Sequence, residues 1–475
     1  MTRAARFLAL SLLVAPGRAD AVAQGQSALT GGAEVARAYD AILDARFADV
    51  PPLLTRTCPP APQPVCGLLD VVSLWWQIQL DPLNLSRDQR FQSSVDASIA
   101  AMERWTSAEP RRAEAWFYLG GAYGARGQWR VLRGQILSAA RDGKRIKAAL
   151  EQALMLDPNL KDAYFGIGLY HYYADVAPVA AKILRFFLLL PGGDRRAGLQ
   201  EMLRARDAGQ LLRSEADYQL HLIYLWYEHQ PLRAIELVAG LRDRHPRNPY
   251  FPQVIADIQD AYLHDRTASL RSWQALLAGA REGRFAEAGL AETRARLGIA
   301  TQLDALYESD RAAEQLRAVI QAKPPAPAGA SAQAQRRLAQ TLARLDDPAY
   351  RLSIEGWRAF ERGALDDAGR LLARSLMLRP DDAVTRYRQA RLLQAQKNDA
   401  AALTILEALV RTRGAAPPVF YAAACVEAAR LHEQRGASAR ALELYRAARG
   451  VFGADERTID DARRAIARLS AAPSR

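Results

Sequence analysis

Apolar residues recur along this chain three and four positions apart, with polar and charged residues between them. This spacing places the apolar side chains on one face of an α-helix. Sustained alternation of β-branched residues is absent, and Asn-Gly or Asp-Gly hairpin signals are few. Ala, Leu and Arg, which favour helices, dominate the 475 residues. The pattern predicts an all-α protein that is too long for one compact core of ordinary size.

One stretch, AWFYLGGAYGARGQW, has large and small residues at fixed helical positions: Trp116, Leu119, Gly120 and Tyr123. It matches W-x2-L-G-x2-Y, the first half of the tetratricopeptide repeat (TPR) pattern. In that pattern the small residue lets two antiparallel helices approach closely, and the large residues fill the space on either side. These four residues are therefore predicted to make repeat packing contacts.

The second half of this repeat arrives late in the sequence. In a standard repeat the Trp and the closing Pro lie about 28 residues apart, whereas Trp116 and Pro158 lie 42 apart. The excess is close to four turns of helix. We place the turn between the two helices at Gly127, and we expect the added residues to lengthen the second helix, with a break near Asp142-Gly143.

Further units follow at standard length. The cleanest is IEGWRAFERGALDDAGRLLARSLMLRPDD, with Gly356, Ala368 and Pro380 at packing positions. Several matches in register resemble the TPR superfamily from about residue 110 to the end. The resemblance implies an α-α superhelical solenoid of TPR-like helical hairpins. DERTIDDARRAIARLS then reads as a polar-faced capping helix, which solenoids need at their ends.

These features divide the chain into five parts. They are a signal peptide (1–23), a divergent N-terminal helical region (24–110), an expanded TPR block (111–322, with the expanded repeat near 111–158), a Pro/Ala/Gly linker (323–335) and a C-terminal TPR block (336–475).

The first residues have the features of an export signal. Arg3 and Arg6 form a basic region, an apolar run follows, and Ala21-Val22-Ala23 is a small-x-small cleavage site. The alternative is a frayed N-terminal helix. We expect an exported protein, periplasmic or associated with the cell envelope. No later segment reaches the roughly 20 apolar residues of a membrane helix.

Two cysteines close together fit an oxidising compartment. Cys58 and Cys66 bracket CPPAPQPVC and are predicted to form a disulfide bond. A metal site is the alternative, but no His or second Cys pair lies nearby to complete four ligands. Cys425 stands alone at a helix position that we expect to be buried and inert.

The formal charge of +12 falls to +10 after the predicted cleavage, and all but six of the basic residues are Arg. A basic balance is typical of nucleic-acid binding, which we do not expect for an exported protein. Anionic lipid, a cell-wall polymer or an acidic protein would suit this charge. A solvated surface with no partner is the alternative.

The resemblance implies that a partner docks on the concave face, which the first helices of the repeats line. Two adjacent repeats place an aromatic and apolar stripe there. Its members are Phe165, Leu169, Tyr172, Tyr173, Ile223, Trp226 and Tyr227. Aromatic side chains provide contact area at low entropic cost, which suits recognition of an apolar peptide. We predict these residues as a partner-binding groove.

The apolar segment 176–191 directly follows the first part of this stripe. It has three interpretations: it is core covered by the aromatic residues, it is part of the groove, or it lies on a membrane surface. Residues 164–200 also resemble a segment of a eukaryotic family of expanded TPR proteins linked to inclusion-body clearance. That resemblance implies a shape and not a cellular role.

Catalytic motifs are missing from the sequence, and its six His are scattered. His171 and His221 lie on neighbouring first helices, but no further ligand lies at metal-binding spacing. We therefore predict a non-catalytic scaffold for a protein or peptide, with no cofactor, no metal and no small-molecule substrate. A peripheral lipid-binding protein using 176–191 is the first alternative. An enzyme with an unrecognised site is the second.

Overall fold

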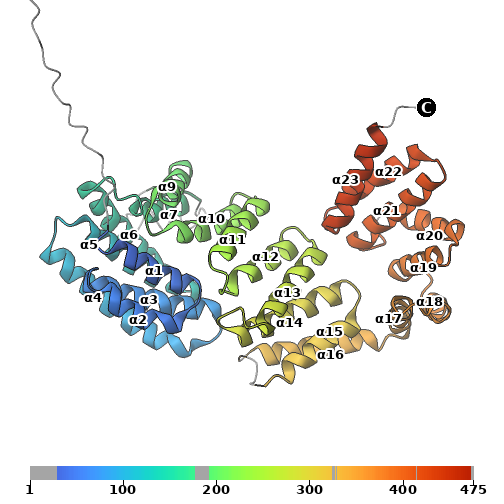
Figure 1. Ribbon diagram of the computed structural model, residues 1–475, viewed down its shortest axis with the longest axis horizontal. Helices are drawn as coiled ribbons and strands as arrows, with labels where there is room; N and C mark the ends of the chain where they lie inside the picture. The colour runs from blue at the N-terminus through green and yellow to red at the C-terminus, as the bar shows by residue number, and fades with distance from the viewer. Residues whose placement is uncertain (1–28, 177–191, 324–326, 328, 413, 472–475) are drawn as a thin grey trace, which may run out of the picture.

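The computed structural model describes residues 29–176, 192–323, 327, 329–412 and 414–471. Their regular structure is entirely helical, which confirms the predicted fold class (Figure 1). The predicted signal peptide and all but the first residue of 176–191 lie outside the described residues. None of the described helices combines the length and the apolar character needed to cross a bilayer.

The helices pack against their neighbours in consecutive hairpins. The N-terminal helices are α1 (Gly32–Leu43), η1 (Phe47–Asp49), α2 (Val50–Thr57), α3 (Gln63–Leu80), η2 (Leu85–Arg87) and α4 (Asp88–Ala108). The front half has α5 (Ala113–Leu132), α6 (Ile136–Leu156), α7 (Ala163–Val176), α9 (Arg195–Ala208), α10 (Arg213–Trp226), α11 (Pro231–Arg244), α12 (Tyr250–Ala261), α13 (Arg266–Arg281), α14 (Ala288–Ala305) and α15 (Ser309–Ile320). The back half has α16 (Ala330–Leu345), α17 (Pro348–Glu361), α18 (Leu365–Leu378), α19 (Ala383–Ala395), α20 (Asp399–Arg411), α21 (Pro418–Gln434), α22 (Ser438–Arg449) and α23 (Glu456–Ala471).

Small residues set the close approach of the two helices in each hairpin. A Cβ atom on Gly120 would lie 2.7 Å from Cδ2 of Leu150, and one on Gly356 would lie 2.8 Å from Cγ of Leu372. Ala368 is fully buried in the hairpin of α17 and α18. Pro380 follows the end of α18, where a helix cannot continue through proline. The packing residues of the repeat pattern therefore lie at helix contacts and helix ends.

The large residues of the expanded repeat brace its first helix. Leu119 is buried, and the Trp116 ring packs against the same core while its Nε1 donates to the Pro110 carbonyl at 3.0 Å. The Tyr123 hydroxyl donates to Oε1 of Glu103 at 2.5 Å, which joins α5 to α4. These contacts fix the position of α5 against the N-terminal helices.

Both helices of the expanded repeat are lengthened. Helix α5 runs through Gly127, which was predicted to be the turn, and the chain turns at Gly134 with a φ of 72°. Helix α6 is continuous through Asp142-Gly143, so the predicted break is wrong. The physical reason is that the buried Asp142 carboxylate accepts bonds from Arg126 and from another arginine of α5, which holds this part of α6 against it.

The predicted linker 323–335 is shorter than expected, because α16 begins at Ala330. Ala334 is fully buried, and Leu338 packs against the same cluster as Leu303 and Leu316 of α14 and α15. Alanine favours a helix and packs closely at such a contact. The hydrophobic core therefore continues across the predicted boundary between the two blocks.

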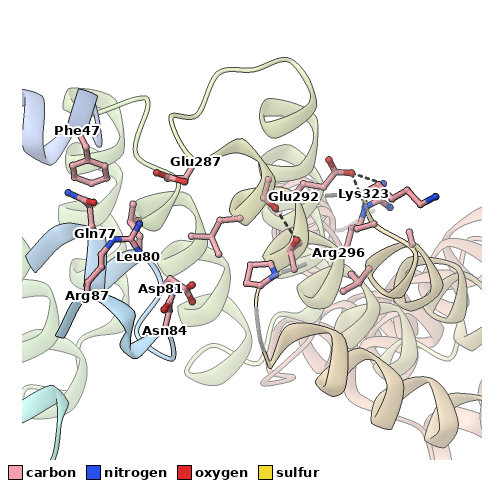
Figure 2. A pocket seen from close by; sticks show the side chains of 17 residues that line it. Phe47, Gln77, Leu80, Asp81, Asn84, Arg87, Glu287, Glu292, Arg296 and Lys323 are labelled. Carbon is pink, nitrogen blue, oxygen red and sulfur yellow. Dashed lines mark hydrogen bonds and ion pairs between the residues drawn. The ribbon is translucent and has the colours of Figure 1, made fainter. Parts of the chain in front are cut away.

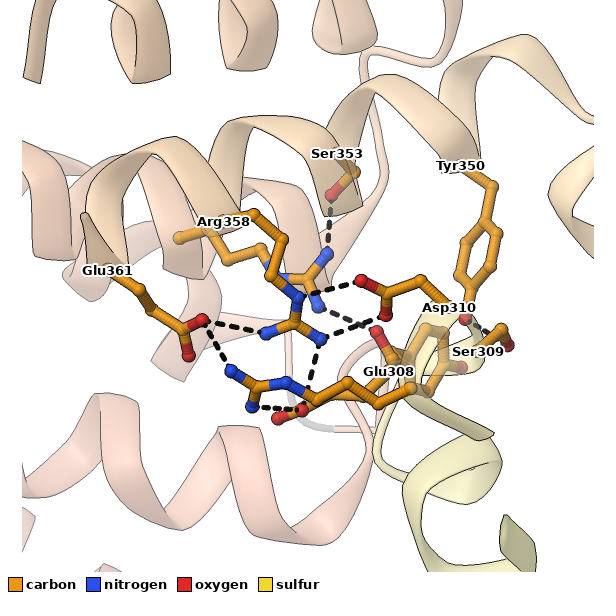
Figure 3. A network of polar contacts seen from close by, with 10 residues as sticks. Glu308, Ser309, Asp310, Tyr350, Ser353, Arg358 and Glu361 are labelled. Carbon is orange, nitrogen blue, oxygen red and sulfur yellow. Dashed lines mark hydrogen bonds and ion pairs between the residues drawn. The ribbon is translucent and has the colours of Figure 1, made fainter. Parts of the chain in front are cut away.

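Ion pairs hold the junction between α15 and α17 (Figure 3). Arg358 binds the Asp310 carboxylate with bonds of 2.8 and 2.9 Å and Glu361 with one of 2.9 Å. On α19, the buried guanidinium of Arg388 donates to the Tyr307 carbonyl at 2.7 Å, and burial lowers the pKa of Arg388. Such bidentate, partly buried pairs fix geometry better than exposed ones. This network joins the back half of the chain to the front half.

The solenoid curves until its end meets α13 (Figure 1). Asp265 Oδ2 accepts a bond from the backbone N–H of Glu456 at 3.1 Å, and Arg271 pairs with Asp455 at 3.0 Å. The His264 and Phe452 rings meet edge to face with centroids 5.0 Å apart. These pairs are more than 180 residues apart in sequence. The stretch from α13 to α23 therefore closes into a ring.

Candidate functional site

The N-terminal helices α1 and α3 pack against α5 and α10, which are first helices of repeats in the front half. A Cβ atom on Gly121 would lie 3.4 Å from Cδ2 of Leu68 on α3. The Tyr39 hydroxyl on α1 donates to Glu215 on α10 at 3.1 Å. The Trp76 ring on α3 meets the Tyr218 ring with centroids 5.5 Å apart. Because one hydrophobic core includes these helices and α5 to α12, the inner face of the front half is filled by the chain itself.

This filling corrects part of the predicted groove. Phe165, Tyr172 and Ile223 are buried in the core, so they are not available as partner anchors. Helix α9 covers α7 directly, since a Cβ atom on Gly198 would lie 2.6 Å from the backbone nitrogen of Tyr172. The Tyr172 hydroxyl donates to Glu228 at 2.6 Å. For these three residues, the structure agrees with the interpretation that the aromatic stripe is part of the core.

The other four predicted groove residues differ in exposure. Leu169, Tyr173 and Tyr227 are half-buried and pack against the core, and the rings of Tyr173 and Tyr227 meet edge to face at 5.6 Å. Trp226 is 51% exposed. Trp226 is therefore the member of the stripe that is most open to solvent, and its role in binding stays a prediction.

A cleft of about 500 Å³ lies elsewhere, between the end of α3 and helices α14 and α15 (Figure 2). The first wall consists of Phe47, Gln77, Leu80, Asp81, Asn84 and Arg87. The second consists of Glu287, Gly289, Leu290, Glu292, Thr293, Arg296, Ala318, Val319, Ala322, Lys323 and Pro327.

Several polar side chains of the cleft are held by their neighbours. Arg296 donates to Glu292 at 2.7 Å and to Gln315 at 2.9 Å, so its charge is matched within α14 and α15. Thr293 donates to the Gly289 carbonyl at 2.9 Å. The side-chain Oδ1 of Asn84 accepts a bond from the backbone N–H of Ser86 in η2 at 3.1 Å, which leaves the side-chain NH2 group for other partners. The walls are thus rigid and partly polar.

The rim of the cleft carries charges that the described part of the chain leaves unmatched. Arg87, Lys323 and Glu287 make no ion pair within 4 Å with any described residue. The lining also includes apolar side chains such as Leu290 and Val319. A cleft that combines apolar side chains with charges of both signs is suited to a short peptide segment with complementary side chains.

Sequence reasoning missed this cleft for a physical reason. Its lining comes from three segments, near 47–87, 287–296 and 318–327, that are more than two hundred residues apart at the extremes. No spacing within one helix joins them. The one local signal was the start of the predicted linker, where Lys323 stands next to a proline-rich stretch.

The two histidines on neighbouring helices have separate surroundings. His171 Nδ1 lies 2.8 Å from a Glu201 carboxylate oxygen. His221 is buried and its Nδ1 contacts the Tyr218 carbonyl, and burial lowers its pKa to about 4. Within the described residues, no three metal-ligating side chains gather in one place.

The cysteines follow the predicted pairing. Cys58 and Cys66 form a disulfide bond between α2 and α3. Cys425 is buried in α21 within the core of the back half. The bond joins the end of α2 to the first turn of α3, so it restrains the helix that lies against α5 and α10.

No family model and no curated protein matches the sequence. Among solved structures, the TPR domain of P58(IPK) is 12% identical with a TM-score of 0.28, covering 85% of this chain and 99% of that one. Yeast Tom70 is 10% identical with a TM-score of 0.27, covering 91% and 86%. The TPR2AB domain of yeast Sti1, solved with a pHSP90 partner, is 14% identical with a TM-score of 0.24, covering 54% and 98%. By its own helix pairing, the described chain is an all-α solenoid of TPR-like helical hairpins.

Proposed function

We propose that this protein is a non-catalytic scaffold that binds a peptide segment of a partner protein in the cleft between α3 and α14–α15. The observation that carries the proposal is that this cleft is open, whereas the inner face of the front half is filled by α1 and α3. Packed helices also hold the cleft on both sides, so binding a peptide should cost the protein little conformational entropy.

The chemistry of the lining favours a peptide with charges of both signs. Arg87 and Lys323 attract carboxylates, and Glu287 attracts a basic side chain. The amide groups of Gln77 and Asn84 can donate to and accept from a peptide main chain. Leu290 in the same lining offers contact to an apolar side chain of the peptide.

A selection from a displayed random peptide library tests this directly. Peptides enriched on the purified protein are expected to bind an Arg87→Glu/Glu287→Lys variant at least tenfold more weakly, because both charge contacts become repulsive. Glu287 is exposed and neither residue is in an ion pair with a described residue, so the variant should fold normally. Isothermal titration with one synthetic peptide measures the loss.

The matched control variant also reverses one acidic and one basic side chain, but both lie outside the cleft. Glu236→Lys/Lys397→Glu lies on the exposed faces of α11 and the α19–α20 turn, and its affinity should stay within about twofold of the parent. A library that yields no binder would contradict the proposal. So would a peptide that binds both variants as tightly as the parent protein.

We propose further that the protein works outside the cytoplasm, in the periplasm or at the cell envelope. The signal-like residues 1–23 and the Cys58–Cys66 bond support this, since disulfide bonds persist in oxidising compartments. In an export-competent bacterial host, the recovered protein should begin at Gln24. Without reductant, the denatured chain should then show one reactive thiol, that of Cys425, and after reduction three.

Mass spectrometry of the intact protein identifies its N-terminal residue, and thiol labelling counts its reactive cysteines. An Ala23→Leu variant, which enlarges the small residue before the cleavage site, should keep its N-terminal segment. A protein that retains Met1 in the parent form, or that shows three reactive thiols without reductant, would argue against export.

A further inference from the structure

Two connections at the same end of the stacked N-terminal helices carry exposed aliphatic side chains. The first connection joins α3 to α4, and the second joins α5 to α6. We call their exposed residues the apolar tips: Leu83, Leu85, Val131, Ile136 and Leu137, each 53% to 79% exposed. Single exposed apolar residues are ordinary, but five on neighbouring connections form a patch that needs an explanation.

The two connections lie side by side because one arginine ties them together. Arg133, between α5 and α6, pairs with both oxygens of Asp88 at 2.6 and 2.8 Å. It also donates to the Pro82 carbonyl at 2.7 Å. Leu83 and Leu85 lie between these two contact points in sequence, and Ile136 follows Arg133 by three residues. The apolar tips therefore share one edge of the molecule.

The same edge is strongly basic. Residues 82–96 and 126–147 contain nine basic and three acidic side chains, a net formal charge of +6 and half of the +12 of the whole chain. All three acidic groups pair with arginines of this edge: Asp88 with Arg133, and Asp96 and Asp142 with Arg126. Lys147 pairs with Glu151 just beyond this range. The positive charge that remains without an ion pair to a described residue is carried by Arg87, Arg90, Arg141 and Lys144.

Some of these cations are free to meet a partner. Arg90, Arg141 and Lys144 are exposed and make no ion pair within 4 Å with a described residue. Exposed cations beside apolar side chains match the two layers of an anionic membrane surface, where headgroup phosphates lie above acyl chains. Aliphatic tips suit the acyl boundary, whereas binding of single-stranded nucleic acid depends on aromatic residues that stack on bases.

We infer that this edge, formed by the α3–α4 and α5–α6 connections, is a docking surface for an anionic lipid bilayer. The apolar tips enter the headgroup region, and Arg90, Arg141 and Lys144 contact lipid phosphates. The helices would then stand with one end against the membrane. Arg87 of the α3–α4 connection also lines the cleft, but the variants that test this surface change no cleft residue, so either proposal can fail without the other.

Vesicle flotation of the purified protein tests the inference. Vesicles of phosphatidylcholine alone are compared with vesicles that also contain about 30 mol% phosphatidylglycerol. Binding is expected only to the anionic vesicles and should weaken as salt rises from about 0.1 M to about 0.5 M, because salt screens the charges. A Leu85→Ser/Ile136→Ser/Leu137→Ser variant should lose at least tenfold in partition coefficient. Arg141→Gln/Lys144→Gln should lose about fivefold for each charge removed.

Matched controls change equally exposed residues elsewhere. Met377→Ser/Leu378→Ser on α18 and Arg374→Gln/Lys397→Gln should bind within about twofold of the parent. Circular dichroism confirms that all variants are folded. The inference is overturned if anionic vesicles do not retain the parent protein, or if the tip variant binds as well as the parent. The inference is also overturned, in favour of a nucleic-acid surface, if the parent protein binds a labelled single-stranded RNA as tightly as it binds anionic vesicles and only the charge variant loses this binding.

Discussion

Replacing Trp76 with alanine should lower the free energy of unfolding by about 3–5 kcal/mol. The Trp76 side chain on α3 is 1% exposed, and its ring meets those of Tyr218, Tyr250 and Phe251 edge to face with centroids 5.5, 6.1 and 5.9 Å apart. Alanine would leave a cavity between the N-terminal helices and α10–α12. Urea unfolding followed by far-ultraviolet circular dichroism measures the loss.

The control for this prediction is another tryptophan of the same protein. Trp226 is 51% exposed, so Trp226→Ala should cost less than about 1 kcal/mol. The same pair distinguishes the two interpretations of the predicted groove. If Trp226→Ala destabilises the fold as much as Trp76→Ala does, the Trp226 ring makes core contacts and has no free face for a partner.

The Trp76 variant also tells whether the N-terminal helices can leave the inner face. Hydrogen exchange of α10 and α12 should rise together with that of α3 in Trp76→Ala, because one hydrophobic core includes all three helices. Rapid exchange confined to α1 and α3 would instead indicate that these helices detach as a unit. In that case the inner face would be available to a partner after all.

Replacing Asp142 with alanine should cost about 3–5 kcal/mol, because removing one partner from a buried ion pair leaves charges without compensation. The Asp142 side chain is fully buried in α6. It accepts bonds of 3.1 and 2.8 Å from Arg126 and one of 2.6 Å from Arg130, both on α5. The variant should therefore separate the two long helices of the expanded repeat, with a lower midpoint of thermal unfolding.

Two further variants make the Asp142 result specific. Asp96 pairs with the same Arg126 but is 63% exposed, so Asp96→Ala should cost less than about 1 kcal/mol. Asp142→Asn keeps the shape and can still accept a hydrogen bond, so its cost should lie between the other two. Equal stability of the parent and Asp142→Ala would show that the arginines find other partners and that this pair does not hold α6 to α5.

The sequence by itself determined the local structure. Helical spacing of apolar residues predicted the all-α fold, and the small residues Gly120 and Gly356 marked the places where two helices touch. The spacing of Cys58 and Cys66 predicted their disulfide bond. Each of these features depends on residues within one hairpin or one short loop, where the geometry of the helix or the reach of the chain leaves few arrangements. The turn at Gly134 was missed because Gly127 is also small and fits between two long helices.

Only the tertiary structure decided which surfaces are covered and which are open. The stripe that includes Tyr172 and Ile223 has the composition of a binding face, but α1, α3 and α9 bury much of it. The cleft brings residues near 80 beside residues near 290 and 320, and the ring closes through Asp265 and Glu456. A helical pattern shows that an apolar face must be covered and does not say by which segment. That choice depends on contacts between segments far apart in sequence, which form only when the whole superhelix has folded.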